Sequence, residues 1–309
     1  MKSLLSLVSI PCILVLSGFP VAYGNDWVLV FEDQFTGTSL DTHNWSRIDY
    51  VNWQVADWRK YQSRDSELLE MNGDSVTLWG RYGNYKTQSN QTAAKATYAC
   101  AGIYTLNTFS FQYGRVEVRA KFDSVQGCWP AIWMMPKNGG TWPASGEIDI
   151  MEHLNYEGSI YQTLHYTNNS GGNASSSVHP DFAGYGGGHK SDWHTYAMEW
   201  TVSGITFYLD GVKTGTFSSS LSSRWPFDDA GNEFYLIIDQ QIGGSWVEGA
   251  GAGGIDQATL AGNGAAFEID YVKVWSDESY MHIIPEPSLF GLLAGLGALA
   301  FAGTRRRRS

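Results

Sequence analysis

Cysteine is scarce in this chain, with only three among 309 residues. Cys12 lies in an apolar run at the N-terminus, so Cys100 and Cys128 are the two that remain in the body of the chain. Neither has the neighbouring ligands of a zinc site, and neither has an identified histidine partner that would activate a thiol nucleophile. One disulfide between them and two buried thiols both fit the sequence.

Positive charge is also in short supply. Lysine and arginine number 20 against 31 aspartate and glutamate residues, which gives a formal net charge of −11 at pH 7. The basic residues form no cluster outside residues 305–308. Because proteins that bind nucleic acids gather Lys and Arg against the phosphate backbone, the composition excludes that class of partner.

The N-terminal residues have the pattern of a secretory signal. Lys2 precedes an apolar run over residues 4–16, and small residues follow as far as Ala22-Tyr23-Gly24. A basic start, an apolar core and a small-residue cleavage site together predict a signal peptide over residues 1–24. The alternative, a buried N-terminal strand, leaves the basic start and the cleavage site unexplained.

The C-terminal residues form a second targeting pattern. Pro285-Glu286-Pro287 is followed by an apolar stretch over residues 288–303 and then by four arginines at residues 305–308. The stretch is short of the ~20 residues of a usual spanning helix. This ending resembles the PEP-CTERM sorting tags of Gram-negative bacteria. The resemblance implies an exported protein, secreted or held at the cell surface or outer membrane, with residues 285–309 as its sorting segment. A permanent membrane anchor is the alternative.

Helical periodicity is almost absent between these ends, whereas alternation with a period of two recurs. Over residues 114–122 apolar and charged side chains alternate, as expected of a strand with one face on a core. The sequence also holds 35 glycines for turns, and 13 Trp, 17 Tyr and 14 Phe. These features predict an all-β fold, a jelly-roll sandwich of two antiparallel sheets, in a single domain over residues 25–280. Similar alternating runs occupy residues 193–201, 205–209 and 267–275.

The most informative segment contains three acids, Glu147, Asp149 and Glu152. Residues two apart on a strand share a face, so Glu147 and Asp149 project together. Glu152 is out of step by one residue. If Ile150 or Met151 is the extra residue of a β-bulge, the register is restored and all three carboxylates line one face.

Such crowding predicts acid–base chemistry. Three carboxylates without an interleaved Lys or Arg raise the pKa of at least one of them, so that it holds a proton near neutral pH. Retaining glycosidases need a nucleophile and an acid/base with carboxyl groups about 5–5.5 Å apart, which one bulged strand can provide. A solvated strand face and a calcium loop are the alternatives. A solvated face would alternate positively and negatively charged side chains, and a calcium loop would place Gly and Asn between its ligands.

The same segment resembles the signature of glycoside hydrolase family 16 in its bulged, laminarinase-like branch. The resemblance implies that Glu147 is the nucleophile, Glu152 the acid/base and Asp149 the carboxyl group that tunes the nucleophile. It also implies a monomer without a required cofactor and a concave cleft open at both ends, hence endo cleavage of a polysaccharide or glycan. Supporting segments occupy residues 31–45, 113–122, 129–134, 193–200, 241–246 and 270–274.

Aromatic residues near the acids are candidate substrate contacts, because flat indole rings stack on the apolar faces of sugars. Trp129 and Trp133 share one face of the strand expected to lie beside the acids. Core packing is the alternative for both. His165 could hydrogen-bond a sugar or the acid/base, or have a purely structural role. The candidate substrate-binding residues are Trp129, Trp133, His165, Trp246, Trp58 and Arg81.

A structural calcium ion is a further implication of the resemblance, since many family members hold one on the convex face. The matching positions are Gln34, Gly73 and Asp270. Gln34 stands where relatives carry Glu, so only its backbone carbonyl is left as a ligand there.

The sugar is not named by the signature. The runs at residues 152–155 and 161–165 resemble members that attack galactosyl bonds in mucin-type O-glycans. This resemblance favours an endo-β-1,4-galactosidase acting on poly-N-acetyllactosamine over an endo-β-1,3(1,4)-glucanase. A lectin-like glycan-binding protein and a transglycosylase could also be built on the same sandwich. The lectin is disfavoured because both glutamates are present.

Overall fold

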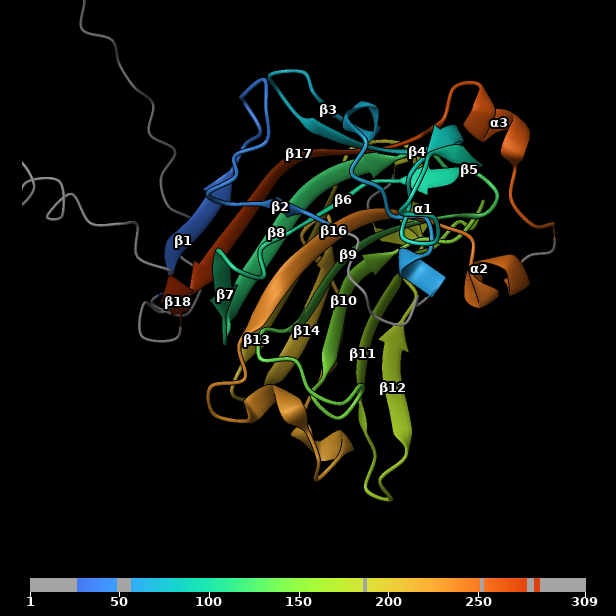
Figure 1. Ribbon diagram of the computed structural model, residues 1–309. Coiled ribbons are helices and arrows are strands. Elements are labelled where there is room, and N and C mark those ends of the chain that lie inside the picture. Colours follow the sequence, from blue (N-terminus) through green and yellow to red (C-terminus); the bar gives the residue numbers. More distant parts are fainter. Residues whose placement is uncertain (1–26, 49–56, 186–187, 251–252, 277–280, 284–309) are drawn as a thin grey trace, which may run out of the picture.

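The computed structural model describes residues 27–48, 57–185, 188–250, 253–276 and 281–283. Within them, two nine-stranded antiparallel sheets stack as a β-sandwich (Figure 1). The predicted all-β sandwich fold is confirmed. The predicted signal peptide, residues 1–24, and the predicted sorting segment, residues 285–309, lie outside the described residues. In the part of the chain that the structure describes, no helix has the length and apolar character to cross a membrane.

The first sheet is built from β1 (Val28–Asp33), β3 (Leu69–Met71), β4 (Val76–Tyr85), β5 (Lys95–Cys100), β8 (Gly114–Phe122), β13 (His194–Thr201), β14 (Gly204–Leu209), β15 (Val212–Phe217) and β17 (Ala265–Ser276). Its strand order is β15-β14-β13-β8-β17-β4-β3, with β1 paired to β17 and β5 to β4. The first strand of the domain therefore pairs with its long penultimate strand, and Val28 lies opposite Ser276.

The second sheet is built from β2 (Ser46–Arg47), β6 (Gly102–Tyr104), β7 (Phe109–Phe111), β9 (Cys128–Pro136), β10 (Glu147–Glu152), β11 (Tyr161–Thr167), β12 (Asn173–Val178), β16 (Phe234–Ile242) and β18 (Met281–Ile283). Its strand order is β12-β11-β10-β9-β16-β6-β2, and β7 pairs with β16 and β18. The strand with the three acids, β10, thus lies inside the sheet between β9 and β11.

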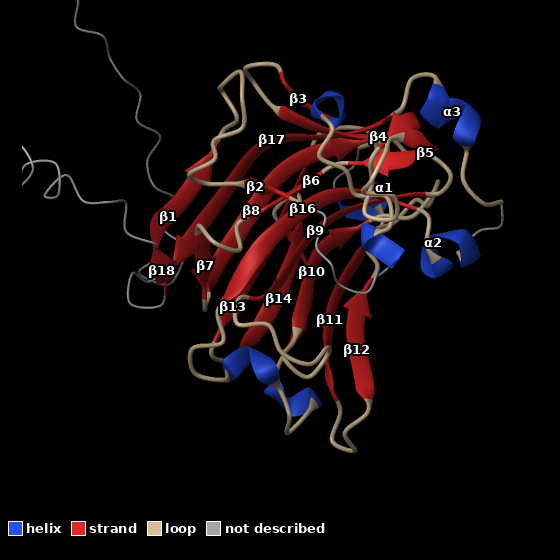
Figure 2. Ribbon diagram, in the orientation of Figure 1, coloured by secondary structure: helices blue, strands red, loops and turns tan. Residues whose placement is uncertain are grey.

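Helices are short and lie outside the two sheets (Figure 2). None of those described exceeds five residues, so none forms a layer of its own. They are α1 (Phe182–Tyr185), α2 (Ser245–Gly249) and α3 (Gln257–Ala261), with the 3₁₀ turns η1 (Asp57–Arg59), η2 (Ser66–Leu68), η3 (Ser219–Leu221) and η4 (Pro226–Asp228).

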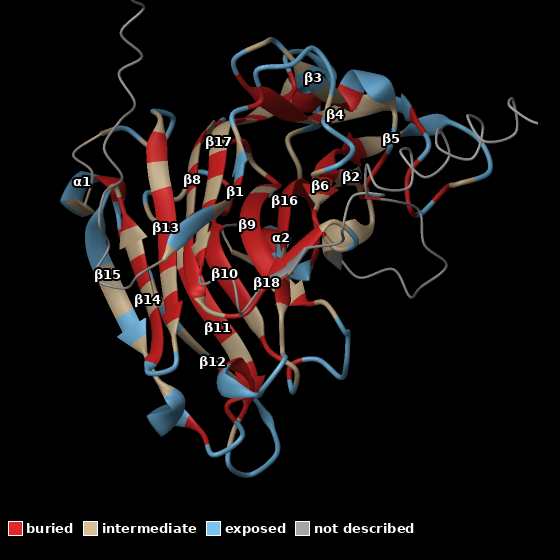
Figure 3. Cartoon of the chain, turned by 90° about the vertical axis from the view of Figure 1, so that its left-hand side faces the viewer, coloured by how far each residue is buried: buried red, intermediate tan, exposed pale blue. Residues whose placement is uncertain are grey.

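Strand alternation builds the core between the sheets. In β8 the apolar residues Val116, Val118 and Ala120 are fully buried, as the sequence predicts. The charged residues of the same strand form ion pairs on the other face, for example Arg115 with Glu199 at 3.1 Å. Figure 3 shows buried residues along the strands and exposed residues in the loops and short helices. Burial of the apolar faces is what holds the two sheets together.

The two cysteines of the domain are both free and buried. They belong to a small apolar cluster with Val125, Ile242 and Leu260. Burial raises the pKa of both thiols, so neither is poised as a nucleophile. The sequence fits either a disulfide or two buried thiols, and the structure has two buried thiols.

Candidate active site

The β10 strand carries a bulge at the predicted place. Against β9, Asp149 pairs with Trp133 and Met151 with Ile132, so Ile150 is the extra residue. The strand begins after Gly146, which has φ = +90° and where a Cβ would come within 2.9 Å of the Phe234 ring. Glycine is therefore required there for both conformation and space.

The bulge brings the three carboxylates to the outer face of the second sheet, the face that points away from the first sheet. The isoleucines between them, Ile148 and Ile150, are buried in the core between the sheets. The side chain of Glu147 is 16% exposed and that of Asp149 2%. Glu152 is 8% exposed. All three are thus partly or wholly removed from water.

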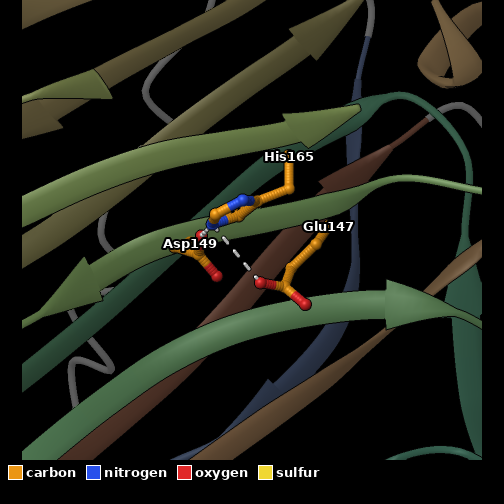
Figure 4. Close-up of side chains that lie close together, drawn as sticks. All are labelled: Glu147, Asp149 and His165. Atoms are coloured by element: carbon orange, nitrogen blue, oxygen red, sulfur yellow. Dashed lines mark ion pairs between the residues drawn. The ribbon is translucent and has the colours of Figure 1, made fainter. Parts of the chain in front are cut away.

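Glu147 and Asp149 share one histidine partner. His165 lies opposite Glu147 on β11, and its Nε2 is 3.6 Å from Glu147 Oε1 and 3.3 Å from Asp149 Oδ2 (Figure 4). The Trp142 indole N–H donates to Glu147 Oε2 at 3.0 Å. Among the described residues, the trio of Glu147, Asp149 and His165 has ligand atoms within 4.8 Å of one another, as a metal site would. A protonated His165 can itself supply the positive charge that the two carboxylates need.

Glu152 has different surroundings. The Trp129 indole N–H donates to Glu152 Oε1 at 3.0 Å, whereas the His165 imidazole pairs with the other two acids. Trp246 stands edge-on to Trp129 with ring centres 5.0 Å apart, and Tyr161 stands edge-on to Trp246 at 5.1 Å. We call Trp129, Tyr161 and Trp246 the aromatic corner.

Asn155 ties the aromatic corner to the end of β10. It follows β10 in the left-handed conformation, with φ = 55°. Its side-chain oxygen accepts the Gly127 N–H at 2.7 Å, and its amide donates to the Val247 carbonyl of α2 at 2.9 Å. Helix α2, which carries Trp246, is thereby tied to the end of β10.

The electrostatics of the two glutamates differ accordingly. Burial, and then the charge of Asp149, raise the pKa of both carboxyl groups. For Glu147, His165 and Trp142 oppose this shift, and the pKa is raised to about 8. For Glu152 the Trp129 hydrogen bond is the one opposing influence, Glu147 and Asp239 add to the rise, and the pKa is raised well above its ordinary value. Burial therefore favours the acid form of both glutamates, and Glu147 is the one whose neighbours, His165 and Trp142, work towards the anion.

Trp133 and Trp58 pack together on the same outer face. Trp133 lies on β9 and is only 6% exposed, and its indole N–H donates to Asp239 at 2.8 Å. Trp58, in η1, stands edge-on to it at 4.9 Å. Of the two predicted contact residues, Trp58 is the one that retains exposure, and Trp133 lies beneath it.

The predicted contact at Arg81 needs correction, and so does one of the alternatives for His165, a bond to the acid/base. The guanidinium of Arg81 lies over the Trp79 ring at 4.5 Å. The neighbouring Gly80 faces Gln240 and Ile242 of the second sheet, so Arg81 points away from that sheet and from the three acids. His165 contacts Glu147 and Asp149, and not the acid/base candidate Glu152.

The predicted calcium ligands do not fit a calcium ion. The Asp270 carboxylate, the one charged group of the set, forms an ion pair with the Arg119 guanidinium. The Gln34 amide donates to Glu32 Oε1 at 2.8 Å, and Gly73 lies in the turn between Asn72 and Ser75. Since calcium takes anionic and carbonyl oxygens, a carboxylate already neutralised by arginine does not favour it.

Sequence reasoning missed three residues of this site: Trp142, Tyr161 and Asp239. Trp142 is 49% exposed although tryptophan is large and apolar. It lies five residues before Glu147, and that proximity was a usable signal. Asp239 interrupts the apolar run of β16, and a lone acid in a buried strand is a second signal. Tyr161 begins the run 161–165 that the sequence singled out, but its contact with Trp246 depends on the position of α2.

A jelly-roll sandwich with two glutamates and an aspartate on one face of a bulged strand is the arrangement of a glycoside hydrolase. Residues 56–259 match the family described as "Glycosyl hydrolases family 16", and the chain belongs to that family.

Two curated relatives illustrate the similarity. The keratan-sulfate endo-1,4-beta-galactosidase of Sphingobacterium multivorum is 34% identical over 260 residues, which cover 81% of this chain and 55% of that protein. The glucan endo-1,3-beta-glucosidase A1 of Niallia circulans is 31% identical over 274 residues, which cover 81% of this chain and 38% of that protein. The chain thus spans about half or less of the length of these relatives.

A solved structure gives the same family likeness. It is described with the words "Prominent members of the human gut microbiota express endo-acting O-glycanases to initiate mucin breakdown". It has a TM-score of 0.70 and 25% sequence identity, and the match covers 84% of this chain and 95% of that chain. The jelly-roll fold is therefore shared along almost the whole length of that enzyme structure.

Proposed function

We propose that the chain is an exported, retaining endo-β-glycosidase that cleaves galactosyl bonds in poly-N-acetyllactosamine or mucin-type O-glycans. The observation that carries this proposal is the unequal environment of Glu147 and Glu152 on one bulged strand. A double displacement needs one carboxylate that is ionised and one carboxylic acid that holds its proton. The contacts of the two glutamates differ in that sense.

In the first step Glu147 attacks the anomeric carbon of the sugar. The bond between this carbon and the glycosidic oxygen breaks, and the proton of Glu152 moves to that oxygen as the leaving sugar departs. The Trp142 N–H and His165 stabilise the Glu147 carboxylate before attack. The product of this step is a covalent glycosyl ester on Glu147.

In the second step water replaces Glu147. The Glu152 carboxylate, now deprotonated, takes a proton from the water, whose oxygen forms the new bond to the anomeric carbon. Glu147 leaves as a carboxylate, and Glu152 regains its proton. Each step inverts the configuration at the anomeric carbon, so the product retains the configuration of the substrate. Asp149, 2% exposed and paired with His165, holds the histidine between the two acids and so tunes the nucleophile.

The substrate assignment rests on two supports. The galactosidase of S. multivorum and the O-glycanase structure are named for galactosyl and mucin-type glycans. The aromatic corner adjoins Glu152, the side of the leaving sugar, and Trp246 is 38% exposed. Its rings offer apolar surfaces to a pyranose ring or to the methyl of an N-acetyl group.

A β-1,3(1,4)-glucanase is the second candidate, and the N. circulans relative favours it. The same carboxylates serve that reaction, so the two candidates differ only in the residues that contact the sugars. We further propose that the enzyme is a monomer that requires no cofactor, that residues 1–24 direct its export, and that residues 285–309 tie it to the cell surface before processing.

Product analysis tests the proposal. The protein is incubated in parallel with mucin O-glycans, poly-N-acetyllactosamine, laminarin, lichenan and agarose. We expect oligosaccharides with galactose at the reducing end from the first two, and proton NMR of the earliest product should give the β-anomer. Glu147→Ala and Glu152→Ala should each lower turnover by roughly a thousandfold.

Each remaining outcome is informative. Glucose oligomers from laminarin or lichenan would transfer the assignment to the glucanases. An α-anomer as first product would contradict retention. Wild-type-like turnover by Glu147→Ala would contradict the mechanism, and binding of a glycan without any product would favour a lectin.

A further inference from the structure

One buried acid on the outer face of the second sheet takes no part in the proposed double displacement. Asp239 lies in the middle of β16 and is 0% exposed. It pairs with Gly102 of β6 on one side and with Ala131 of β9 on the other, and Ala131 in turn pairs with Glu152. Asp239 and Glu152 therefore stand in one row of the sheet, separated by a single alanine and by about 10 Å of sheet.

Small neighbours make room for this acid. At Gly102 a Cβ would come within 2.5 Å of the Asp239 Cβ and within 2.3 Å of Ile48. Any larger residue at this position would push Asp239 out of the row. The space that Gly102 leaves is filled by the Asp239 side chain and its partners.

The carboxylate is held by three N–H groups. Trp133 Nε1 donates to Oδ1 at 2.8 Å, and Gln241 Nε2 donates to the same oxygen at 3.1 Å. Gln62 Nε2 donates to Oδ2 at 2.9 Å. These donors come from β9, from β16 and from the segment after η1, so Asp239 joins three parts of the chain around one buried point.

The most consequential of these partners is Trp133. Its ring supports Trp58, whose plane stands at 85° to it with ring centres 4.9 Å apart. Asp149 pairs with Trp133 across β10 and β9, so this ring lies directly beside the catalytic strand. A turn of the Trp133 indole would displace the Trp58 ring.

We propose that Asp239 is a positioning residue that fixes the Trp133 indole and, through it, the Trp58 ring beside the catalytic strand. This inference rests on the proposed glycosidase function, because the fixed surface is one on which a sugar would lie. Asp239 itself is covered and does not touch the substrate.

The charge of Asp239 has a second effect. Burial raises its pKa to about 7, against the hydrogen bonds of Trp133 and Gln241 and the charge of Arg59. The charged and titratable groups around it are Arg59 from η1, Cys100 from β5 and Glu152 from β10. When ionised, Asp239 raises the pKa of Glu152 and so helps it keep its proton.

Two substitutions separate the roles of shape and charge. In Asp239→Asn the side-chain oxygen can still accept from Trp133 and Gln241. Its new amide would face Gln62, whose Oε1 has no hydrogen-bond partner among the described residues and can accept after the Gln62 amide turns. In Asp239→Ala the Trp133 and Gln241 N–H groups lose this acceptor, whereas the Gln62 amide keeps the Gln240 carbonyl at 3.3 Å. The control is Asp270→Asn, which removes the same charge from the first sheet, where Asp270 pairs with Arg119.

For Asp239→Ala we expect KM to rise by roughly tenfold or more, with a smaller change in kcat, together with an altered near-UV circular dichroism of the tryptophans. Asp239→Asn should restore KM to within about threefold and keep the wild-type tryptophan spectrum. Its alkaline limb of kcat/KM should move to lower pH, because Glu152 loses a neighbouring negative charge. Asp270→Asn should leave both KM and the alkaline limb unchanged.

Unchanged KM and unchanged tryptophan spectrum in Asp239→Ala would overturn the proposal. An Asp239→Asn variant that folds but has its KM raised as much as that of Asp239→Ala would also overturn the proposal. If Asp239→Ala does not fold, Asp239→Asn alone decides through its spectrum and pH profile. If the wild-type enzyme cleaves no glycan, the proposed function fails, whereas the circular dichroism comparison, which needs no substrate, still tests the link from Asp239 to Trp133.

Discussion

At the scale of single residues, the surroundings of Glu152 favour its protonated form over its carboxylate anion. It is 8% exposed and lies near Glu147, Asp149 and Asp239. Its folded-state pKa is raised, so the folded protein binds this proton more tightly than the unfolded chain does. The stability that this group contributes is therefore lost as the pH rises from the pKa of Glu152 in the unfolded chain, near 4.5, towards its raised pKa in the folded protein.

Replacing Glu152 by glutamine should therefore stabilise the fold at neutral pH while abolishing turnover. The gain should be about 1–3 kcal/mol at pH 8, or a few degrees in the melting temperature, since glutamine removes the cost of keeping this buried carboxyl group protonated above its unfolded pKa. Below pH 4 the acid is protonated in both states and the gain should vanish. Differential scanning fluorimetry across this pH range measures it.

The control is Glu268→Gln, which alters a partly exposed acid paired with Lys121 on the first sheet. No comparable gain is expected there. A gain for Glu152→Gln that is equal at pH 4 and pH 8 would contradict the assignment of a buried, proton-holding acid.

Residue spacing predicted the three carboxylates and the bulge, because both follow from the two-residue period of a strand. It did not predict which ring touches which acid. Trp142 reaches Glu147 from a loop and Trp129 reaches Glu152 from a neighbouring strand, so those pairs depend on tertiary placement. The sequence could name the aromatic residues near the site but not their partners.

At the scale of elements, the end of β10 depends on a neutral histidine. His153 is fully buried, its Nε2–H donates to the Glu157 carbonyl at 2.8 Å, and its ring lies 4.5 Å from that of Phe122. Burial lowers its pKa to about 4. The buried site at the end of β10 therefore favours the uncharged form of His153.

The consequence is a loss of stability in acid. The unfolded chain takes up this proton as the pH falls below 6.5, whereas the folded protein does not until about pH 4. Stability should fall by up to about 3 kcal/mol across that window. His153→Gln, which can still donate to Glu157, should flatten this part of the stability curve in urea titrations.

His43→Gln provides the control, because the His43 side chain is 80% exposed and should leave the curve as it is. If His153→Gln and the wild type lose stability in parallel between pH 6.5 and 4, another group is responsible for the acid sensitivity.

Alternation also predicted strands well, and β8 has the expected boundaries. It failed for Arg81 because alternation gives the two faces of a strand but not the sheet to which the strand belongs. Once β4 pairs with β17 in the first sheet, Gly80 takes the inward face and Arg81 the outward one. Pairing partners are set by the whole fold and cannot be read from one segment.

At the scale of the whole molecule, the two sheets share one large core. It joins Phe31, Trp45 and Phe109 to Phe182 and Tyr196 in one continuous cluster of buried residues. A second domain would need a core of its own. The predicted single domain over residues 25–280 therefore has a simple thermodynamic signature.

We expect a single cooperative unfolding transition. Far-UV circular dichroism, which follows the strands, and tryptophan fluorescence should change together in guanidinium, with the same midpoint. The many tryptophans, 13 in the chain, make the second probe sensitive to both sheets. Two midpoints that differ beyond error would contradict a single domain.

The pairing of β1 with β17 also sets an order of events during biosynthesis. Val28 lies close to the start of the domain and pairs with Ser276, close to the end of the domain. This edge of the sheet can form only after Ser276 has been synthesised. Strand β17 lies between β8 and β4 as well, so much of the first sheet is incomplete until that strand has left the ribosome. Contacts this distant in sequence form slowly. The first sheet of a nascent chain would stay incomplete for most of its synthesis, and a chain in that state could still be threaded through a secretion channel if residues 1–24 direct export as we propose.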